Sequence, residues 1–172
     1  MSLHFLVEQG DIAAVSKRLV KGADVNESSQ YSGRTPLICA LDLVAAKASV
    51  GLELVALLIE RGADVNQIAE EKYGQYGQKF EQLPLLAAVR SHSIAALRLL
   101  LDAGAKVCPE NTRFRCVLMD AMTAYDDDFC EGGDGLDEIL RLLIERGADV
   151  DAVYPHGPGG RAESAVTRAS SE

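Results

Sequence analysis

Runs of leucine and other large aliphatic residues recur along this chain, and a glycine follows each run. The three richest runs span residues 55–61, 97–103 and 139–146. Aliphatic residues at this density and spacing are typical of helices that bury one face. A glycine just past such a run can adopt the left-handed backbone conformation that ends a helix. We therefore predict a helix that ends at each of the glycines Gly62, Gly104 and Gly147.

The same glycines begin a short motif that returns at a regular interval. It reads Gly22-Ala23-Asp24-Val25-Asn26 in its first copy and returns at 62–66, in altered form at 104–108, and again at 147–151. Successive copies begin 40, 42 and 43 residues apart. A unit that recurs every few tens of residues indicates a repeat array rather than one closed core.

A second motif precedes the helices, most clearly as Thr35-Pro36-Leu37-Ile38-Cys39-Ala40. Proline in the first turn of a helix removes no backbone hydrogen bond that the helix needs. Together with the glycine motif, this segment resembles the ankyrin repeat, whose signature is T-P-L-H-x-A; Ile38 stands in place of the histidine. Leu83-Pro84-Leu85 and Cys116-Val117-Leu118 are weaker copies, and Leu3-His4 fits the end of the signature.

The resemblance implies an all-α solenoid of helix-turn-helix pairs with projecting β-turn fingers. We expect one array over residues 1–172, with about four repeats and a terminal half-repeat. The expected repeats span approximately 1–31, 32–80, 81–113 and 114–161, with a partial repeat at 162–172. No sheet core is expected.

The first unit differs from the others in its second helix. Lys17 and Arg18 occupy the positions, counted back from the glycine, that Leu57 and Leu58 occupy in the second unit. A terminal repeat has no neighbour on one side, so that side must be polar. We therefore predict an N-terminal cap in which Lys17 and Arg18 are exposed, with Met1 near the start of the array. The later leucines Leu58, Leu100 and Leu143 should be buried.

Three stretches exceed what a minimal repeat needs. The second unit is six residues longer than the third around 45–51, where the extra residues lie between the two helices or extend them. The finger at 67–82 carries Tyr73, Tyr76 and Phe80, which either contact a partner or fold back onto the array. The segment 125–138 holds seven carboxylates and no lysine or arginine. Its spacing lacks the turn glycine and the bidentate glutamate of a calcium loop, which favours a solvated acidic loop.

The composition of the chain argues against several classes of function. With a net charge of −9 and a pI near 4.8, the chain lacks the basic surface that nucleic-acid binding requires. It contains neither an apolar run long enough to span a membrane nor a secretory signal, so we expect a cytoplasmic protein. The four cysteines lack metal-ligand spacing and are expected to be reduced. The three histidines fall in different units, and no catalytic constellation, cofactor site or metal site is expected.

The resemblance implies that finger tips and the inner face of the first helices bind other proteins. We therefore expect a non-enzymatic protein-interaction module that is monomeric and whose protein partner is basic. The alternative is a targeting or substrate-recruiting ankyrin domain of a larger enzyme or effector. The candidate partner-binding residues are Tyr31, Arg34, Tyr73, Tyr76, Phe80, Arg90, Arg113 and Arg115, together with Gln30 and Asn111.

Overall fold

The structure, a computed structural model, describes residues 2–46, 48–73, 78–107, 117–118, 121 and 134–149. The described residues are mostly helical, as the sequence predicts. The chain divides into two compact units, Met1–Ala105 and Lys106–Glu172.

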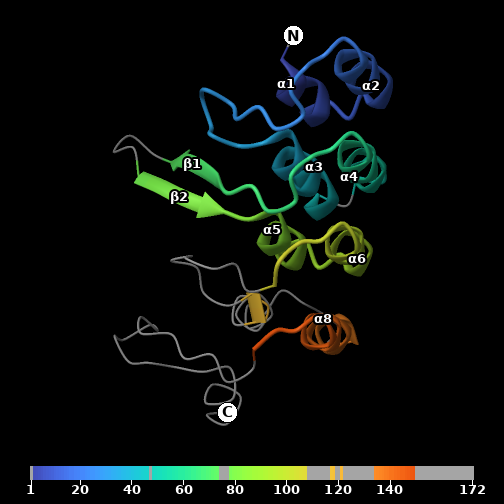
Figure 1. The fold of residues 1–172 in the computed structure, drawn as a ribbon, viewed down its shortest axis with the longest axis vertical. Helices are drawn as coiled ribbons and strands as arrows, with labels where there is room; N and C mark the ends of the chain where they lie inside the picture. The colour runs from blue at the N-terminus through green and yellow to red at the C-terminus, as the bar shows by residue number, and fades with distance from the viewer. Residues whose placement is uncertain are drawn as a thin grey trace. The chain divides into compact units, whose positions relative to one another are not determined.

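Six helices in the described part of the first unit form three consecutive pairs (Figure 1). In chain order they are α1 (Leu3–Glu8), α2 (Ile12–Val20), α3 (Pro36–Ala45), α4 (Val50–Glu60), α5 (Pro84–Arg90) and α6 (Ile94–Asp102). Within each pair the two helices pack against each other. Between pairs, α3 contacts both α1 and α5, and α4 contacts both α2 and α6. Each pair therefore packs on its neighbours in chain order, as stacked repeats do.

Side-chain caps fix where several of these helices begin. Thr35 Oγ1 accepts a hydrogen bond from the Ile38 amide at 3.3 Å, and Pro36 follows as the first residue of α3. Asp11 caps α2 and Ser93 caps α6 in the same way. Each cap satisfies one of the backbone N–H groups that a helix N-terminus leaves unpaired. The Thr-Pro signature is therefore a helix start in this fold.

The leucines that precede the glycines form the core of the stack. Leu58 and Leu100 are fully buried, whereas Lys17 and Arg18, at equivalent positions of α2, are exposed. Leu143, in the second unit, is also fully buried. The predicted contrast between a polar α2 and apolar later helices is confirmed.

The glycines that end the second helices all have left-handed backbones. Their φ angles are +85° at Gly22, +87° at Gly62, +91° at Gly104 and +91° at Gly147. After each one the chain closes the helix with a backbone hydrogen bond, such as that from the Ala63 amide to the Leu58 carbonyl at 2.9 Å. The helix stops predicted from the sequence are confirmed, including the one in the altered third copy.

Replacing Gly62 with alanine should therefore lower stability through backbone strain alone. An added Cβ at Gly62 would meet no atom of the described residues within 4 Å, so no steric clash contributes. A left-handed backbone costs an L-residue about 1–2 kcal/mol, and alanine recovers part of this by restricting the unfolded chain. We expect a loss of about 1 kcal/mol in urea unfolding. Gly62→Asn should lose less, because asparagine tolerates this conformation; equal losses would point to another cause.

The remainder of the glycine motif joins neighbouring repeats by hydrogen bonds. Asp24 Oδ1 accepts from the Asn26 amide at 2.9 Å, and Asn26 Oδ1 in turn accepts from the Asp64 amide of the next copy at 2.8 Å. The second copy repeats the pattern, with Asp64 Oδ1 accepting from the Asn66 amide and Asn66 Nδ2 donating to the Gly104 carbonyl at 3.1 Å. The aspartate thus shapes its own turn, and the asparagine binds the following repeat.

The six extra residues of the second unit are absorbed mostly as helix. Compared with the third unit, α3 is three residues longer than α5, α4 is two longer than α6, and the turn between them is one longer. Within this insertion, Gly51 is a buried residue of α4. Of the two placements that the sequence left open, extension of the helices therefore accounts for most of the added length.

The long second finger forms a β-hairpin. Strands β1 (Ala69–Tyr73) and β2 (Gln78–Gln82) pair antiparallel, with Ala69 opposite Gln82 and Tyr73 opposite Gln78. The hairpin projects from the helices on the side where the first finger also lies (Figure 1). The sequence predicted a turn at this finger; it did not predict two five-residue strands. The expectation of no sheet core holds for the described residues, whose two strands form this hairpin.

The described part of the second unit contains helix α8 (Asp134–Glu145). Ile139 and Leu143 are fully buried, and the Ala148 amide closes the helix on the Leu143 carbonyl at 3.0 Å. The helix begins at Asp134, so it includes Asp137 and Glu138 at the end of the acidic segment 125–138. Acidic residues are favourable in the first turns of a helix. Residues 122–133 and the expected partial repeat 162–172 lie outside the described residues.

Among the described residues, no helix has the length and apolar character needed to cross a lipid bilayer.

Candidate functional site

Backbone and side-chain hydrogen bonds hold the base of the first finger. His4 Nε2, on α1, donates to the Arg34 carbonyl at 3.0 Å, and the Ser29 amide donates to the same oxygen at 2.8 Å. The Arg34 amide donates to Ser32 Oγ at 3.4 Å. His4 is only 6% exposed, so the residue in the signature's histidine position is a buried, hydrogen-bonded structural residue. This finger is therefore fastened to α1 across some thirty residues of sequence.

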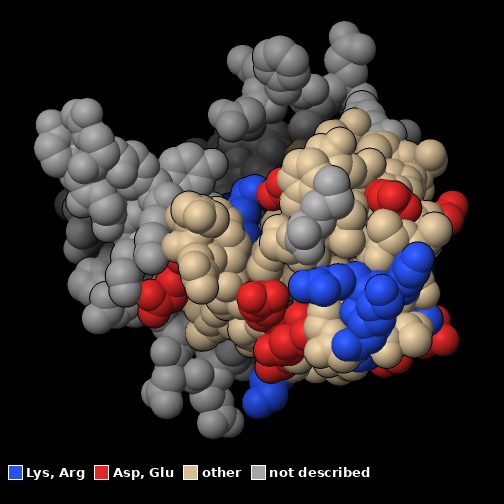
Figure 2. All heavy atoms as spheres, turned by 90° about the horizontal axis from the view of Figure 1, so that it is seen from above, with Lys and Arg blue, Asp and Glu red and all other residues tan. Residues whose placement is uncertain are grey.

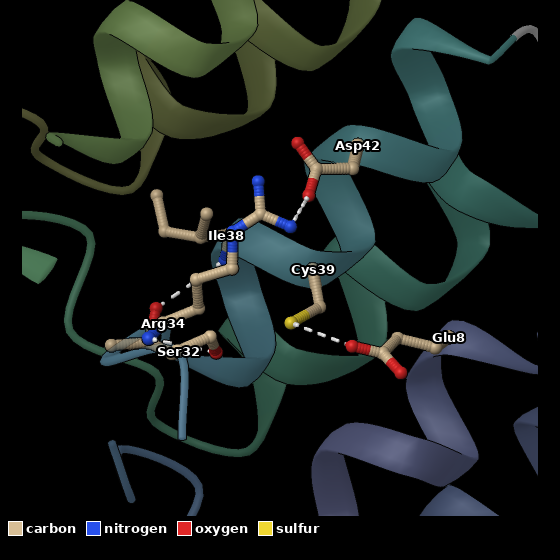
Figure 3. A network of polar contacts seen from close by, with 7 residues as sticks. Glu8, Ser32, Arg34, Ile38, Cys39 and Asp42 are labelled. Atoms are coloured by element: carbon tan, nitrogen blue, oxygen red, sulfur yellow. Dashed lines mark hydrogen bonds and ion pairs between the residues drawn. The ribbon is translucent and has the colours of Figure 1, made fainter. Parts of the chain in front are cut away.

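The Arg34 side chain makes a second attachment, to α3. Its Nη1 lies 2.7 Å from Asp42 Oδ2, with the two side chains 27% and 40% exposed (Figure 3). Nearby on the same helix, the buried thiol of Cys39 lies 4.0 Å from Glu8 Oε1, at the end of α1. Arg34, which was predicted as a partner contact, thus forms an ion pair within its own repeat, and its side chain is 27% exposed. It supports the finger while part of its guanidinium remains at the surface.

The tip of the first finger is open to solvent. Tyr31 is 93% exposed, the highest value among the large hydrophobic residues described, and Gln30 beside it is also exposed. Gly33 closes the turn behind it with a φ of +75°, and its amide donates to the Ser29 carbonyl at 2.7 Å. The site therefore presents an aromatic side chain on a loop whose base is fixed.

The aromatic residues predicted on the second finger belong to its hairpin or to its turn. Tyr73 ends β1, and Phe80 lies in β2 opposite Glu71. Tyr76 lies outside the described residues. Whether these rings bind a partner or pack on their own repeat stays a prediction.

The predicted arginines fall in different places. Arg90 is exposed at the last position of α5, on the same series of first helices as Asp42 of α3. Arg113 and Arg115, with Asn111, lie outside the described residues. Of the predicted contacts, the structure thus gives the side-chain exposure of Gln30, Tyr31, Arg34 and Arg90.

Two exposed apolar residues, one on α1 and one at the base of the second finger, were not predicted as contacts. Phe5, on α1, is 41% exposed, and Ile68, just before β1, is 42% exposed. Ile68 lies two residues after the glycine motif, which ends at Asn66, where a polar residue would be expected on an exposed turn. The presence of a large aliphatic residue there was the signal that could have identified it.

In the part of the chain that the structure describes, no three His, Cys, Asp or Glu side chains gather where they could hold a metal ion. Cys39 is buried and forms no disulfide, in agreement with the expectation of reduced cysteines. The other three cysteines lie outside the described residues. The site contains the exposed ring of Tyr31 and the ion pair between Arg34 and Asp42.

A comparison with known protein families finds a match for part of the chain. Residues 32–70 match the family model described as Ankyrin repeat. This match begins at Ser32, after the tip of the first finger. It includes the Thr35-capped helix α3 and its partner α4, and it reaches the first residues of β1. The helix pairs, the glycine stops and the signature helix start agree with it. The chain therefore contains an ankyrin repeat at residues 32–70, and ankyrin repeats generally mediate protein–protein interaction.

Proposed function

We propose that this chain is a non-enzymatic interaction module that binds a protein partner through its fingers and the adjoining inner face of its first helices. In this proposal the array is a solenoid of about four repeats with a terminal half-repeat, and it acts as a monomer. The observation that carries the proposal is Tyr31, a 93% exposed ring on a finger whose base is fixed by hydrogen bonds and an ion pair.

A fixed loop with an exposed aromatic tip is suited to recognition for energetic reasons. Tyrosine buries a large ring at a low cost in side-chain entropy and keeps a polar hydroxyl for a hydrogen bond. Because the Arg34 carbonyl and guanidinium already fasten the finger, little backbone entropy is lost when a partner binds. Phe5 and Ile68 would add apolar contact area near it.

Charge indicates the character of the partner. The chain has a net charge of −9, and Glu8 and Asp42 lie on the first helices, which form the proposed binding face. A basic partner would be attracted to this surface, and salt would weaken its association. The acidic segment 125–138 would increase this attraction.

Replacement of Tyr31 by alanine tests the proposal. A partner is first isolated by affinity capture with the intact chain and identified by mass spectrometry, and its Kd is then measured by calorimetry. We expect Tyr31→Ala to raise the Kd about tenfold or more, as loss of an interface hot spot does, and to leave the unfolding midpoint unchanged. Ile144→Ala, at a residue of α8 that is 49% exposed, is the matched control and should leave the Kd unchanged. An unchanged Kd for Tyr31→Ala would remove the first finger from the binding surface.

A further inference from the structure

A compact basic patch lies on the outer side of the first repeat, on α2 rather than on the fingers. Lys17, Arg18 and Lys21, at the end of α2, are all exposed. Arg61 of the second repeat joins them, because its Nη2 donates to Ser16 Oγ of α2 at 3.3 Å. We call these four cations the α2 basic patch. Seen from the N-terminal end of the stack, Lys and Arg side chains gather on the side where α2 lies (Figure 2).

The geometry of α2 places three of its residues side by side. With 3.6 residues per turn, Val20, Lys17 and Lys21 fall within roughly 100° of helix surface, and Arg18 lies about 100° beyond Lys17. Val20 is 77% exposed, so the patch contains a large aliphatic group beside its ammonium groups. Segment 12–21 contains no carboxylate.

Three cations of the patch have no carboxylate partner among the described residues. Among the residues that the structure describes, Lys17, Arg18 and Lys21 form no ion pair. Their place at a helix C-terminus stabilises positive charge through the helix dipole. The patch therefore remains charged and accessible, although it belongs to a chain whose net charge is −9.

We propose that the α2 basic patch is a second interaction surface, which binds an acidic segment of a protein partner that carries aliphatic side chains. Carboxylates of the segment would pair with Lys17, Lys21 and Arg18, and an aliphatic side chain would cover Val20. The surface is separate from the fingers and prefers the opposite charge in its partner. The chain would thus bind two partners of opposite charge at once.

The extent of the patch favours a short peptide segment over other polyanions. At physiological salt, charges interact over about 8–10 Å, so a short segment responds mainly to the patch itself. Duplex DNA and anionic membranes are extended, and they would also meet the acidic remainder of the surface, which repels them.

The test uses the intact chain and a dye-labelled peptide in which Glu-Glu-Leu is repeated four times. The Kd is measured by fluorescence anisotropy for the unaltered protein and for Lys17→Glu/Lys21→Glu. We expect the double reversal to raise the Kd about tenfold or more, since it replaces two attractions with two repulsions. An increase in sodium chloride from about 50 to about 500 mM should weaken binding to the unaltered protein much more than to the variant.

A matched control has the same change in net charge at other helices. Arg98→Glu/Arg141→Glu reverses two exposed arginines of α6 and α8 and should leave the Kd within about twofold. Circular dichroism of both variants shows whether they remain folded. The proposal is overturned if the unaltered protein does not bind the peptide, if both double variants weaken binding equally, or if duplex DNA or phosphatidylserine vesicles bind more tightly than the peptide. Because Tyr31 is unaltered throughout, these outcomes do not depend on the proposed finger surface.

Discussion

Truncation of Leu100 to alanine is expected to lower the free energy of unfolding by about 2–5 kcal/mol. Leu100 is fully buried in α6, which packs against α4 and α5. The change removes methylene and methyl groups from this interface, and the close-packed neighbours cannot fill the space. Loss of the transfer free energy and the remaining cavity both contribute. Urea unfolding followed by far-ultraviolet circular dichroism measures the difference.

Arg18→Ala is the control for this experiment, because Arg18 stands at the same distance before Gly22 as Leu100 does before Gly104. Arg18 is exposed, so its truncation should cost well under about 1 kcal/mol. A large loss at Leu100 with a small loss at Arg18 would follow from the burial difference between the two positions. Similar losses would contradict the assignment of equivalent positions in the two repeats.

The helix ends were predictable because each depends on a short piece of sequence. Gly62 and Gly104 follow directly on leucine-rich helices, and a positive φ at a helix end favours glycine for reasons internal to that residue. The start of α3 was predictable in the same way, from the capping hydroxyl of Thr35 and the preset ring of Pro36. Short pieces of sequence were therefore enough to predict where these helices begin and end.

The candidate site was less predictable because it depends on contacts between distant segments. Arg34 was expected to be a free contact, yet its partner Asp42 is eight residues away on a helix, and its carbonyl is bound by His4 of another repeat. The ion pair between Arg34 and Asp42 has no sequence signature. The exposure of Tyr31 is likewise a result of how the finger is fastened. The basic patch on α2 was identified in the sequence only as a polar cap.

The strands of the second finger show a different limit. Segment 67–82 contains glycines and many polar residues, and glutamate and lysine are depleted in strands generally. The hairpin is nevertheless formed, with five pairs from Ala69 opposite Gln82 to Tyr73 opposite Gln78. Strand propensity depends on pairing and context more than on composition. A pattern of single residues therefore could not distinguish a hairpin from a long turn.

Gly51 is the position where a small substitution should have the second largest effect. It lies near the start of α4, where an added Cβ would stand 2.7 Å from the backbone nitrogen of Val44 and 2.9 Å from the carbonyl carbon of Leu43. Both atoms belong to the backbone of α3, which cannot rotate away as a side chain could. The absence of a side chain at Gly51 therefore allows α3 and α4 to approach closely at this point.

Two opposing effects decide the outcome of Gly51→Ala. Alanine favours a helix over glycine by at most about 1 kcal/mol, and by less near a helix end. The clash forces a shift of two packed helices, and overpacking of this kind costs about 1–3 kcal/mol or more. We therefore expect a net loss of about 2 kcal/mol in urea unfolding. Ala56→Gly, at an exposed position of the same helix, measures the propensity difference alone and should cost about 1 kcal/mol. If Gly51→Ala instead raised stability by a similar amount, the close approach of α3 and α4 would be disproved.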